Sequence, residues 1–405
     1  MNDKEIKNIT VTIIFEGSAL NRDENIGGNV QSIKKLTFAD RQLSFISKFA
    51  MRHYLFNTLK KAYPECWVDT PVTLSKSEDK EGGSKKKQVI QFDLGKSNIL
   101  DSAELDAFGY MYTKEGISLT RKAPVGITKA VSLFPYKNDM AFYANHDMVR
   151  RAIDEGIIET SDPDPYNKEE NLNLFKVSFT IDAKIFGEDC WIVNKESYNS
   201  GKLTLTIEYK KDEKQIKHET TIECSLGNEG NQYETDKGSI IIEEMKGVQK
   251  KKVTMKVNNE IKRRRIKQIL CAIKNGLVAP ASGEDNTIVP LFMIAAPVKV
   301  PSPIFHPYIH VSIGEGRIEV IGIGDCLKNS WIDGQKVFVM NSERLSIPES
   351  LNSSLEKEGR LYKSFEEFLS ACGLCKEGCE KVECNPKEDK HTKGTQAGSN
   401  PNAGS

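Results

Sequence analysis

Four cysteines near the end of the sequence have the spacing best suited to binding a metal. Cys372, Cys375, Cys379 and Cys384 follow the pattern C-x2-C-x3-C-x4-C, and four thiolates can hold zinc in a tetrahedral site. Structural zinc sites usually separate two close pairs of ligands by a longer loop, which this segment lacks. We therefore favour free thiols, keep zinc as the alternative, and expect no cofactor.

The histidines show no pattern typical of nucleophilic catalysis. None of the six lies in a motif that pairs it with a serine or a cysteine. The segment HPYIH places His306 and His310 four residues apart, but Pro307 opposes the helix that would align them. Asp23 and Glu24 are adjacent acids in a loop, where such residues are usually exposed to solvent. We predict no catalytic residue from these patterns.

Basic residues near the N-terminus are arranged to suit a polyanion. Thr37 and Asp40 match a capping box, which predicts a helix from about Thr37 to Lys60. At 100° per residue, three basic side chains would lie within a sector of roughly 40°: Arg41, Lys48 and Arg52. Three aromatic side chains accompany this row: Phe45, Phe49 and Phe56. No carboxylate follows Asp40 in the segment, so the row could meet several phosphates, although a solvated face is the alternative.

The loop before this segment, SALNRDENIGGNVQ (18–31), could also bind an anion. Gly27 and Gly28 can adopt backbone conformations that point amide N–H groups into a concave site. A nucleotide-triphosphate loop is excluded, because no Gly-Lys-Ser/Thr sequence follows. A plain turn is the alternative.

A second basic segment runs from Lys246 to Lys267, with ten basic residues and one acid, Glu260. Such clustering favours salt-dependent binding of phosphates that tolerates any base sequence. Arginines next to a helix N-terminus also oppose the helix dipole, which suggests that they have another use. A solvated helix surface is the alternative. The candidate polyanion contacts are Lys250, Lys251, Lys252, Arg263 and Arg264.

The composition is that of a soluble globular protein. The chain has 405 residues, 57 basic and 57 acidic side chains, and 38% hydrophobic residues. No apolar run approaches the roughly 20 residues of a membrane helix, and the polar N-terminus does not resemble a signal peptide. Nine cysteines, an odd number, argue against a disulfide framework. We expect a cytoplasmic protein without a membrane partner.

Strands and helices must position these segments. Alternating apolar residues predict a strand with one buried side at 8–16. Further strands are expected at 106–112, 127–134, 176–186, 202–210 and 287–298, with a hairpin at 311–323. A second helix is expected from Asn258 to Asn275, before the stop signal Gly276. Residues 75–88 should form a mobile loop, the acidic stretch 154–173 should interrupt the regular elements, and 386–405 should be disordered.

The order of these elements predicts an α+β fold. A strand, a long helix, strands with long insertions, a helix and a strand follow the βαββαβ plan of a ferredoxin-like or RNA-recognition-motif domain, enlarged by its loops. A doubly wound sheet would need a more regular alternation of helices and strands. We expect a single domain of this kind over residues 1–385.

Several segments resemble the DevR-type backbone subunit of type I CRISPR interference complexes, of subtype I-B. The resemblance rests on LNRDENIGGNVQSIKKL, ADRQLSFISKFAMRHYL, DAFGYMY and LTRKAPVGITKAVSLFPY. It covers residues 8 to 190 by motif, and the remainder by the order of elements.

The resemblance implies a function and its partners. Members of the family have an RNA-recognition-like palm and stack head to tail along a CRISPR guide RNA (crRNA), within a Cascade complex that contains other subunits. A thumb from each copy crosses the RNA and displaces one base at regular intervals, which leaves the other bases to pair with target DNA. These subunits bind RNA and do not cut it. The resemblance implies a finger or web loop at about 62–105 and the thumb at about 142–175.

The resemblance also nominates RNA-binding residues. The first helix and the loop before it would grip the guide backbone through Asn21, Arg22, Gly27, Gly28, Asn29, Arg41, Gln42, Lys48 and Arg52. Arg121 and Lys122 would approach the RNA from the other side, with Met111 as a candidate wedge. The acidic thumb would repel phosphates, so we expect it to meet a basic patch, such as 246–267, on the next copy.

Two other functions stay open. Related backbone subunits of type III complexes cleave RNA with a loop aspartate and a metal, and Asp23 lies in a comparable loop. The other alternative is a stand-alone nucleic-acid-binding regulator, a role that the DevR name suggests.

Overall fold

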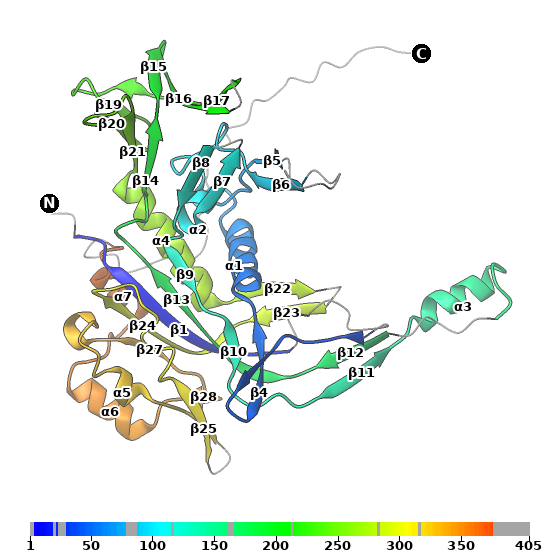
Figure 1. Cartoon of the computed structure of the whole chain (residues 1–405). Coiled ribbons are helices and arrows are strands. Elements are labelled where there is room, and N and C mark those ends of the chain that lie inside the picture. Colours follow the sequence, from blue (N-terminus) through cyan, green and yellow to red (C-terminus); the bar gives the residue numbers. More distant parts are fainter. Residues whose placement is uncertain are drawn as a thin grey trace, which may run out of the picture.

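The computed structural model describes residues 4–18, 22, 30–77, 87–114, 117–160, 166–211, 214–281, 284–314 and 317–375. The fold is α+β, with one large sheet and several small ones (Figure 1). Within these ranges, no helix combines the length and the apolar character needed to cross a membrane.

A large antiparallel sheet forms the centre of the molecule. Its strands neighbour one another in the order β27-β24-β1-β13-β10-β4-β3, and β9 also pairs with β13. Their bounds are β1 (Asn8–Gly17), β3 (Lys35–Phe38), β4 (Arg41–Ile46), β9 (Val125–Ile127), β10 (Ala130–Ser132), β13 (Asn173–Ile181), β24 (Pro290–Val298) and β27 (Phe338–Met340). The strands predicted at 8–16, 176–186 and 287–298 are therefore confirmed, and 127–134 contains the end of β9 and all of β10.

Strand β1 is buried on both faces, whereas its alternating pattern predicted one buried side. On one face Ile9, Val11 and Ile13 join the core formed with α1 (Lys48–Ala62) and α4 (Asn259–Asn275). On the other face Ile14 packs on the C-terminal region. The prediction was wrong because threonines occupy part of this second face, and a buried hydroxyl looks like an exposed one in a sequence.

A polar seam joins the second face of the sheet to the C-terminal region. Thr12 Oγ1 lies 2.6 Å from Ser178 Oγ, which lies 3.0 Å from His306 Nδ1. Beside them, Lys176 Nζ donates to the carbonyl oxygen of Ile309 at 2.7 Å. Burial, together with the charge of Lys176, lowers the pKa of His306 to about 4, and burial lowers the pKa of Lys176 to about 8. The seam therefore favours a neutral imidazole.

The C-terminal region contains a small sheet and short helices. The hairpin predicted at 311–323 is confirmed as β25 (His310–Gly314) and β26 (Arg317–Ile321), which β28 (Leu345–Ser346) extends. The helices are α5 (Ile323–Cys326), η1 (Asp333–Gln335), α6 (Glu349–Lys357) and α7 (Phe365–Ala371). The amide of Lys7 donates to the carbonyl oxygen of Cys372, which ties the first strand to the end of the last helix.

Residues 37–60 do not form one helix, and this prediction was wrong. Thr37 pairs with Gln42 in the hairpin β3–β4, whose turn contains Ala39 at a φ of 53°. Helix α1 begins only at Lys48, where the Ser47 side chain accepts a hydrogen bond from the Ala50 amide. Two apolar runs separated by two residues are typical of a hairpin, and β4 gains further pairing from β10. These strand interactions outweigh the local capping pattern.

Two further local predictions need correction. Only the second half of 106–112 is a strand, because α2 (Ala103–Phe108) is capped by Ser102 and ends at Gly109. A Cβ atom at position 109 would lie 2.3 Å from the Arg121 carbonyl oxygen, so the sharp exit requires glycine. The acidic stretch 154–173 contains a regular element, β12 (Tyr166–Glu170). By contrast, the second helix is confirmed as α4, followed by Gly276 at a φ of 113°.

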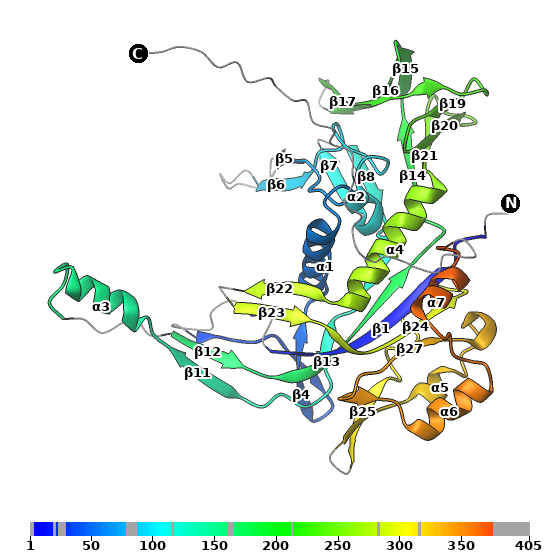
Figure 2. The ribbon, with the colours of Figure 1, turned by 180° about the vertical axis from the view of Figure 1, so that it is seen from behind.

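A long arm projects from the sheet and ends in a helix. It consists of β11 (Asp139–Tyr143), α3 (His146–Asp154) and β12, and β2 (Val30–Gln31) pairs with β12. None of the residues of α3 is buried. Figures 1 and 2 both show the arm and the hairpin β5–β6 projecting to the same side of the molecule, with α1 between them.

A second unit with its own core lies beyond the upper end of α1 in Figure 1. Its first part contains β5 (Val72–Ser77), β6 (Lys87–Phe92), α2, β7 (Tyr110–Lys114) and β8 (Ile117–Arg121). Its second part contains β14 (Glu188–Val193), β15 (Lys195–Asn199), β16 (Lys202–Lys211), β17 (Lys214–Glu223), β18 (Ser225–Leu226), β19 (Gln232–Glu234), β20 (Gly238–Glu244) and β21 (Lys251–Val257). The strand predicted at 202–210 is confirmed.

The hairpin β22 (Leu277–Ala281) and β23 (Glu284–Ile288) contacts α1 through the Val278 amide, which donates to Thr58 Oγ1 at 2.9 Å. Strands β5 and β6 extend into the segment 75–88 that was predicted to be a loop, and 78–86 lie outside the described residues. The tail 386–405 also lies outside them.

Candidate nucleic-acid interface

Lys48 and Arg52 lie on the same side of α1, roughly 40° apart around its axis. Lys48 is exposed. The Arg52 guanidinium lies 4.9 Å from the ring centroid of Phe108, and its Nη2 lies 3.6 Å from Oε1 of Glu104. Burial lowers the pKa of Arg52 and the Glu104 charge opposes that shift, but a guanidinium stays protonated. Arg52 is therefore a cation held in a defined direction at the edge of the helix.

The most exposed face of α1 carries Phe49, which was predicted to accompany the basic row, together with residues that the sequence analysis did not name. Phe49 is 70% exposed, and the Lys48 ammonium lies 5.0 Å from its ring centroid. One turn further on, His53 is exposed and its Nε2 lies 2.8 Å from Nδ2 of Asn57. Lys60 pairs with Asp69 at 2.8 Å. A helix start at Ser47, signalled by a serine before KFAM, would have placed these side chains on one face.

Arg41 and Gln42 do not extend the row on α1, because they belong to β4. Arg41 is exposed and its Nε lies 3.7 Å from Oδ1 of the neighbouring Asp40. The carbonyl oxygen of Gln42 accepts the Tyr136 amide at 2.7 Å, and its side chain is exposed. With ~3.3 Å per residue, the strand places Arg41 roughly 20 Å ahead of Lys48. Both residues can still face a ligand that runs along the hairpin and the helix.

Lys129 reaches the start of α1 from another part of the chain. Its ammonium lies 5.3 Å from the ring centroid of Phe45 on β4. The next residue, Ala130, pairs with Ile46, the last residue of β4. Lys129 lies inside the segment ITKAVSLF, but only the pairing of β10 with β4 shows that it lies beside the end of β4, shortly before α1 begins.

Arg22 lies at the base of the arm, where it is bound to acidic residues. Its Nη2 lies 2.9 Å from Oε1 of Glu170, and its Nη1 donates to the carbonyl oxygen of Glu169 at 2.6 Å. Lys35 Nζ lies 2.7 Å from Oε2 of Glu169. Burial raises the pKa of Glu169, but the hydrogen bonds from Lys35 and from the Ile33 amide outweigh it and hold the pKa below its usual value. Two acids of the arm are thus neutralised within the chain.

The other candidates of the preceding loop lie outside the described residues. These are Asn21, Gly27, Gly28 and Asn29, together with Asp23 and Glu24. Their assignment stays a prediction.

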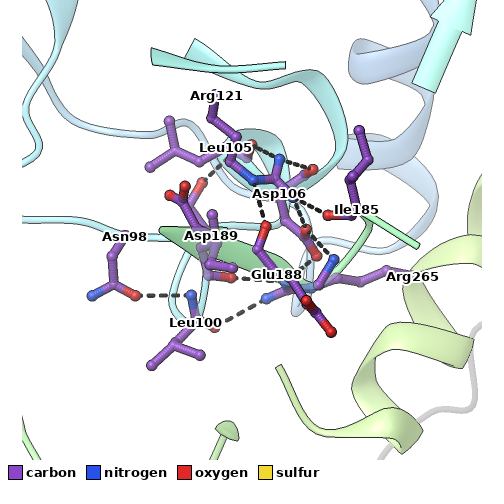
Figure 3. Close-up of polar contacts among 12 residues, drawn as sticks. Asn98, Leu100, Leu105, Asp106, Arg121, Ile185, Glu188, Asp189 and Arg265 are labelled. Carbon is purple, nitrogen blue, oxygen red and sulfur yellow. Dashed lines mark hydrogen bonds and ion pairs between the residues drawn. The ribbon is translucent and has the colours of Figure 1, made fainter. Parts of the chain in front are cut away.

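Arg121 is buried and does not face a ligand, which corrects its placement at an RNA surface (Figure 3). Its Nη2 lies 2.9 Å from Oδ1 of Asp106, and its guanidinium also donates to the carbonyl oxygens of Leu105, Asp106, Ile185 and Glu188. Every direction in which the fork could donate is therefore used inside the protein. By contrast, Lys122 and Met111 are exposed.

The second basic segment does not form one patch. Lys251 pairs with Glu196 at 2.6 Å and with Glu244 at 2.8 Å, hydrogen bonds that raise the pKa of Lys251, and Lys252 pairs with Glu243 at 3.2 Å. These lysines begin β21, and α4 begins after its far end, roughly 20 Å away. On α4, Arg263 Nε donates to the Gly373 carbonyl oxygen at 3.0 Å. Lys250 and Arg264 are exposed.

One basic residue near the start of α4, Arg265, is buried. Arg265 Nη1 lies 2.8 Å from Oδ2 of Asp106, and its guanidinium also donates to the carbonyl oxygens of Ile99 and Leu100. Figure 3 shows Arg121 and Arg265 on either side of Asp106. These contacts connect α4 with α2 and β8, so this part of the KRRR run serves the fold.

The cysteine and histidine candidates for metal binding are not gathered in the described part of the chain. Cys372 is fully buried and Cys375 is half-buried, while Cys379 and Cys384 lie outside the described residues. His306 faces Ser178, and Nδ1 of the exposed His310 accepts the amide of Val311. No group of three or more potential metal ligands occurs among the residues that the structure describes.

Comparisons with known proteins identify a family and a set of similar solved structures, two of which are described below. The family model described as "CRISPR-associated negative auto-regulator DevR/Csa2" matches residues 9–315. No curated protein matches the chain. Two solved chains, described as "CRISPR RNA-guided surveillance complex" and "CRISPR RNA-guided surveillance complex, pre-nicking", are each 11% identical to it. Each match covers 90% of this chain and 98% of the other, with a TM-score of 0.45.

Proposed function

The chain belongs to the DevR/Csa2 family of CRISPR-associated proteins, and we propose that it is a backbone subunit that binds guide RNA in a type I-B interference complex. The observation that carries the proposal is the pair Lys48 and Arg52 on one side of α1, with Lys129 beside the start of the helix. Glu104 and Phe108 hold Arg52 in place, so one cation is oriented before any ligand arrives.

The cations of this surface suit contact with phosphates rather than with the edges of bases. Lysine and arginine side chains on a helix bind the sugar–phosphate backbone without reading its sequence. A subunit that must accept every guide needs this kind of contact. Arg41, Gln42 and Lys122 are exposed and belong to the proposed contact set, whereas Arg121 does not.

The topology supports a ferredoxin-like palm. Along the chain, β1, α1, β10, β13, α4 and β24 follow the βαββαβ order. In the sheet, the strands neighbour one another as β24-β1-β13-β10, with β1 in the interior. The helices α1 and α4 pack on one face, as this plan requires.

The projecting arm is the proposed thumb. Met140 and Phe142 lie two residues apart on β11, so they point to the same face, and both are exposed. They suit a wedge that crosses an RNA strand better than Met111 does, since Met111 lies on β7, outside the arm. Arg22 and Lys35 neutralise the acidic side chains at the base of the arm. The acidic side chains near α3 would therefore be the ones that face the next copy. The copies would stack along the crRNA, bind other subunits of the complex, and leave bases free for target DNA.

Salt-dependent RNA binding by the full chain tests the proposal. Lys48→Ala and Arg52→Ala should each weaken binding of every RNA sequence alike and lower the salt slope by about one per lost phosphate contact. Lys61→Ala is the matched control, because Lys61 is exposed on α1 but roughly 140° from Lys48 and 180° from Arg52. Equal binding by Lys48→Ala and Lys61→Ala would refute the interface.

The same preparation separates the alternative functions. Expressed with its operon neighbours, the chain should form long assemblies that carry protected RNA, which it leaves uncut when Mg²⁺ is added. Discrete RNA products that disappear in Asp23→Ala would show a ribonuclease instead. Tight binding to a specific duplex DNA without assembly on RNA would show a stand-alone regulator.

A further inference from the structure

We propose that the exposed ring of Phe49, together with His53 one turn further along α1, is a stacking site for bases of the bound RNA. The inference rests on the proposed function, because it assigns bases to the helix whose Lys48 and Arg52 face phosphates. It gives α1 two adjacent strips, one for the backbone and one for bases.

The three phenylalanines of this segment have different surroundings. Phe56 is 8% exposed and packs edge-on against Phe108, with ring centroids 6.1 Å apart. Phe45 is half-buried beneath the Lys129 ammonium. Phe49 alone of the three is largely exposed. Isolated exposed apolar side chains are common, so the exposure of Phe49 requires a second observation before it indicates a ligand.

The second observation is the charge around the ring. Lys48 lies over Phe49, and Arg52 follows three residues later. The Glu104 carboxylate near this side of α1 already pairs with Arg52 and accepts the Thr70 amide. An aromatic ring flanked by cations is the arrangement with which proteins hold single-stranded nucleic acid, since bases stack while cations bind phosphates. An apolar protein surface would have to desolvate the same cations without compensation.

His53 extends the stacking surface. It lies four residues after Phe49, roughly 40° around the helix and about 6 Å further along its axis. The hydrogen bond to Asn57 fixes the direction of the imidazole ring. Two rings on neighbouring turns can therefore receive bases from one strand.

The contact between Lys48 and Phe49 suggests how the ring is covered in the free chain. In the free chain the ammonium covers the ring. A cation–π contact at an exposed position is weaker than the stacking of a base on an aromatic ring. A base can therefore replace the ammonium, which then turns toward the adjacent phosphate.

A fluorescent RNA tests the inference in the full chain. The probe is a single-stranded RNA with 2-aminopurine at successive positions, titrated at several salt concentrations. Phe49→Leu keeps an apolar side chain but removes the ring, and it should weaken binding roughly 5- to 150-fold while leaving the salt slope unchanged. It should also reduce the quenching of 2-aminopurine. Phe49→Trp should bind as tightly as the wild type, and His53→Ala should weaken binding in the same way as Phe49→Leu.

The outcomes separate this inference from the function on which it rests. Wild-type affinity in Phe49→Leu, with weakened binding in Lys48→Ala, overturns the stacking site alone. A loss of self-association without a loss of RNA affinity overturns it too, because the ring then packs on protein. A wild-type chain that binds no RNA overturns both. Tyr209→Leu is the control for losing an exposed ring, since Tyr209 lies on β16.

Discussion

Asp106 and Arg265 form a buried ion pair across 159 residues of sequence, with Arg265 Nη1 2.8 Å from Asp106 Oδ2. Arg121 binds the other carboxylate oxygen, and the Gly187 amide donates to the same atom. One carboxylate therefore holds two buried guanidinium groups, and α2, β8 and α4 meet at this point.

Asp106→Asn should destabilise the fold by about 3–5 kcal/mol, because removing one partner leaves buried charge without compensation. The amide keeps an acceptor for one arginine and turns its NH2 group toward the other. Denaturation in urea would measure the change. Asp101→Asn is the control, since its pair with Lys237 is exposed and should contribute less than about 1 kcal/mol.

Ser47→Ala should cost about 1 kcal/mol, because the hydroxyl caps the first turn of α1. Thr37→Ala should change stability by less than about 0.5 kcal/mol, because Thr37 is exposed on the hairpin. Chemical denaturation followed by circular dichroism compares the two. A larger loss of stability in Thr37→Ala than in Ser47→Ala would indicate a helix that begins at Thr37.

Arg22→Ala should loosen the arm, because it removes the hydrogen bonds of a charged donor to the Glu170 carboxylate and to the Glu169 carbonyl oxygen, and hydrogen bonds to charged groups are worth about 1.5–3 kcal/mol each. Amide hydrogen exchange in β11 and β12 should become at least roughly tenfold faster. Arg151→Ala removes an exposed pair with Asp147 near the tip and should leave the rates in both strands unchanged. Unchanged exchange in Arg22→Ala would show that Arg22 is available for another partner.

His306→Asn should make the chain less sensitive to acid. The pKa of His306 falls from 6.5 to about 4 on folding, so in this interval the unfolded chain binds a proton that the folded chain does not. Wild-type stability should therefore decrease as the pH falls from 6.5 to 4. Asparagine can keep the contact with Ser178 without titrating, which should flatten this part of the profile. Urea unfolding at several pH values measures it, with exposed His310→Asn as the control.

Local periodicity correctly predicted the helices and strands whose formation does not depend on one particular partner strand. Helix α4 has apolar residues at helical spacing and a glycine stop, and β24 is a continuous apolar run. The segment 37–60 failed because β4 depends on β10, with Ile46 opposite Ala130. No window around Thr37 contains that partner. A serine immediately before KFAM was the available local signal for the true helix start.

The sequence correctly predicted that two residues of the candidate site lie together only where the two belong to the same helix or strand. Lys48 and Arg52 stayed together because both belong to α1. The resemblance placed Arg121 at an RNA surface, and no local pattern showed its buried partner Asp106, which belongs to a helix that was predicted as a strand. A sequence shows that arginines cluster, but the carboxylates that neutralise them are often distant along the chain. Burial therefore separated the arginines that stabilise the fold from the cations left at the surface.

Strand β1 has a consequence for biosynthesis. Its two neighbours are β13 and β24, which leave the ribosome about 160 and 280 residues later. At about 5–20 residues per second, the wait for β24 lasts roughly 15 to 55 s. During that time an apolar segment with unpaired edges is accessible to chaperones and to other nascent chains. Newly made copies should thus depend on such protection until β24 has been synthesised.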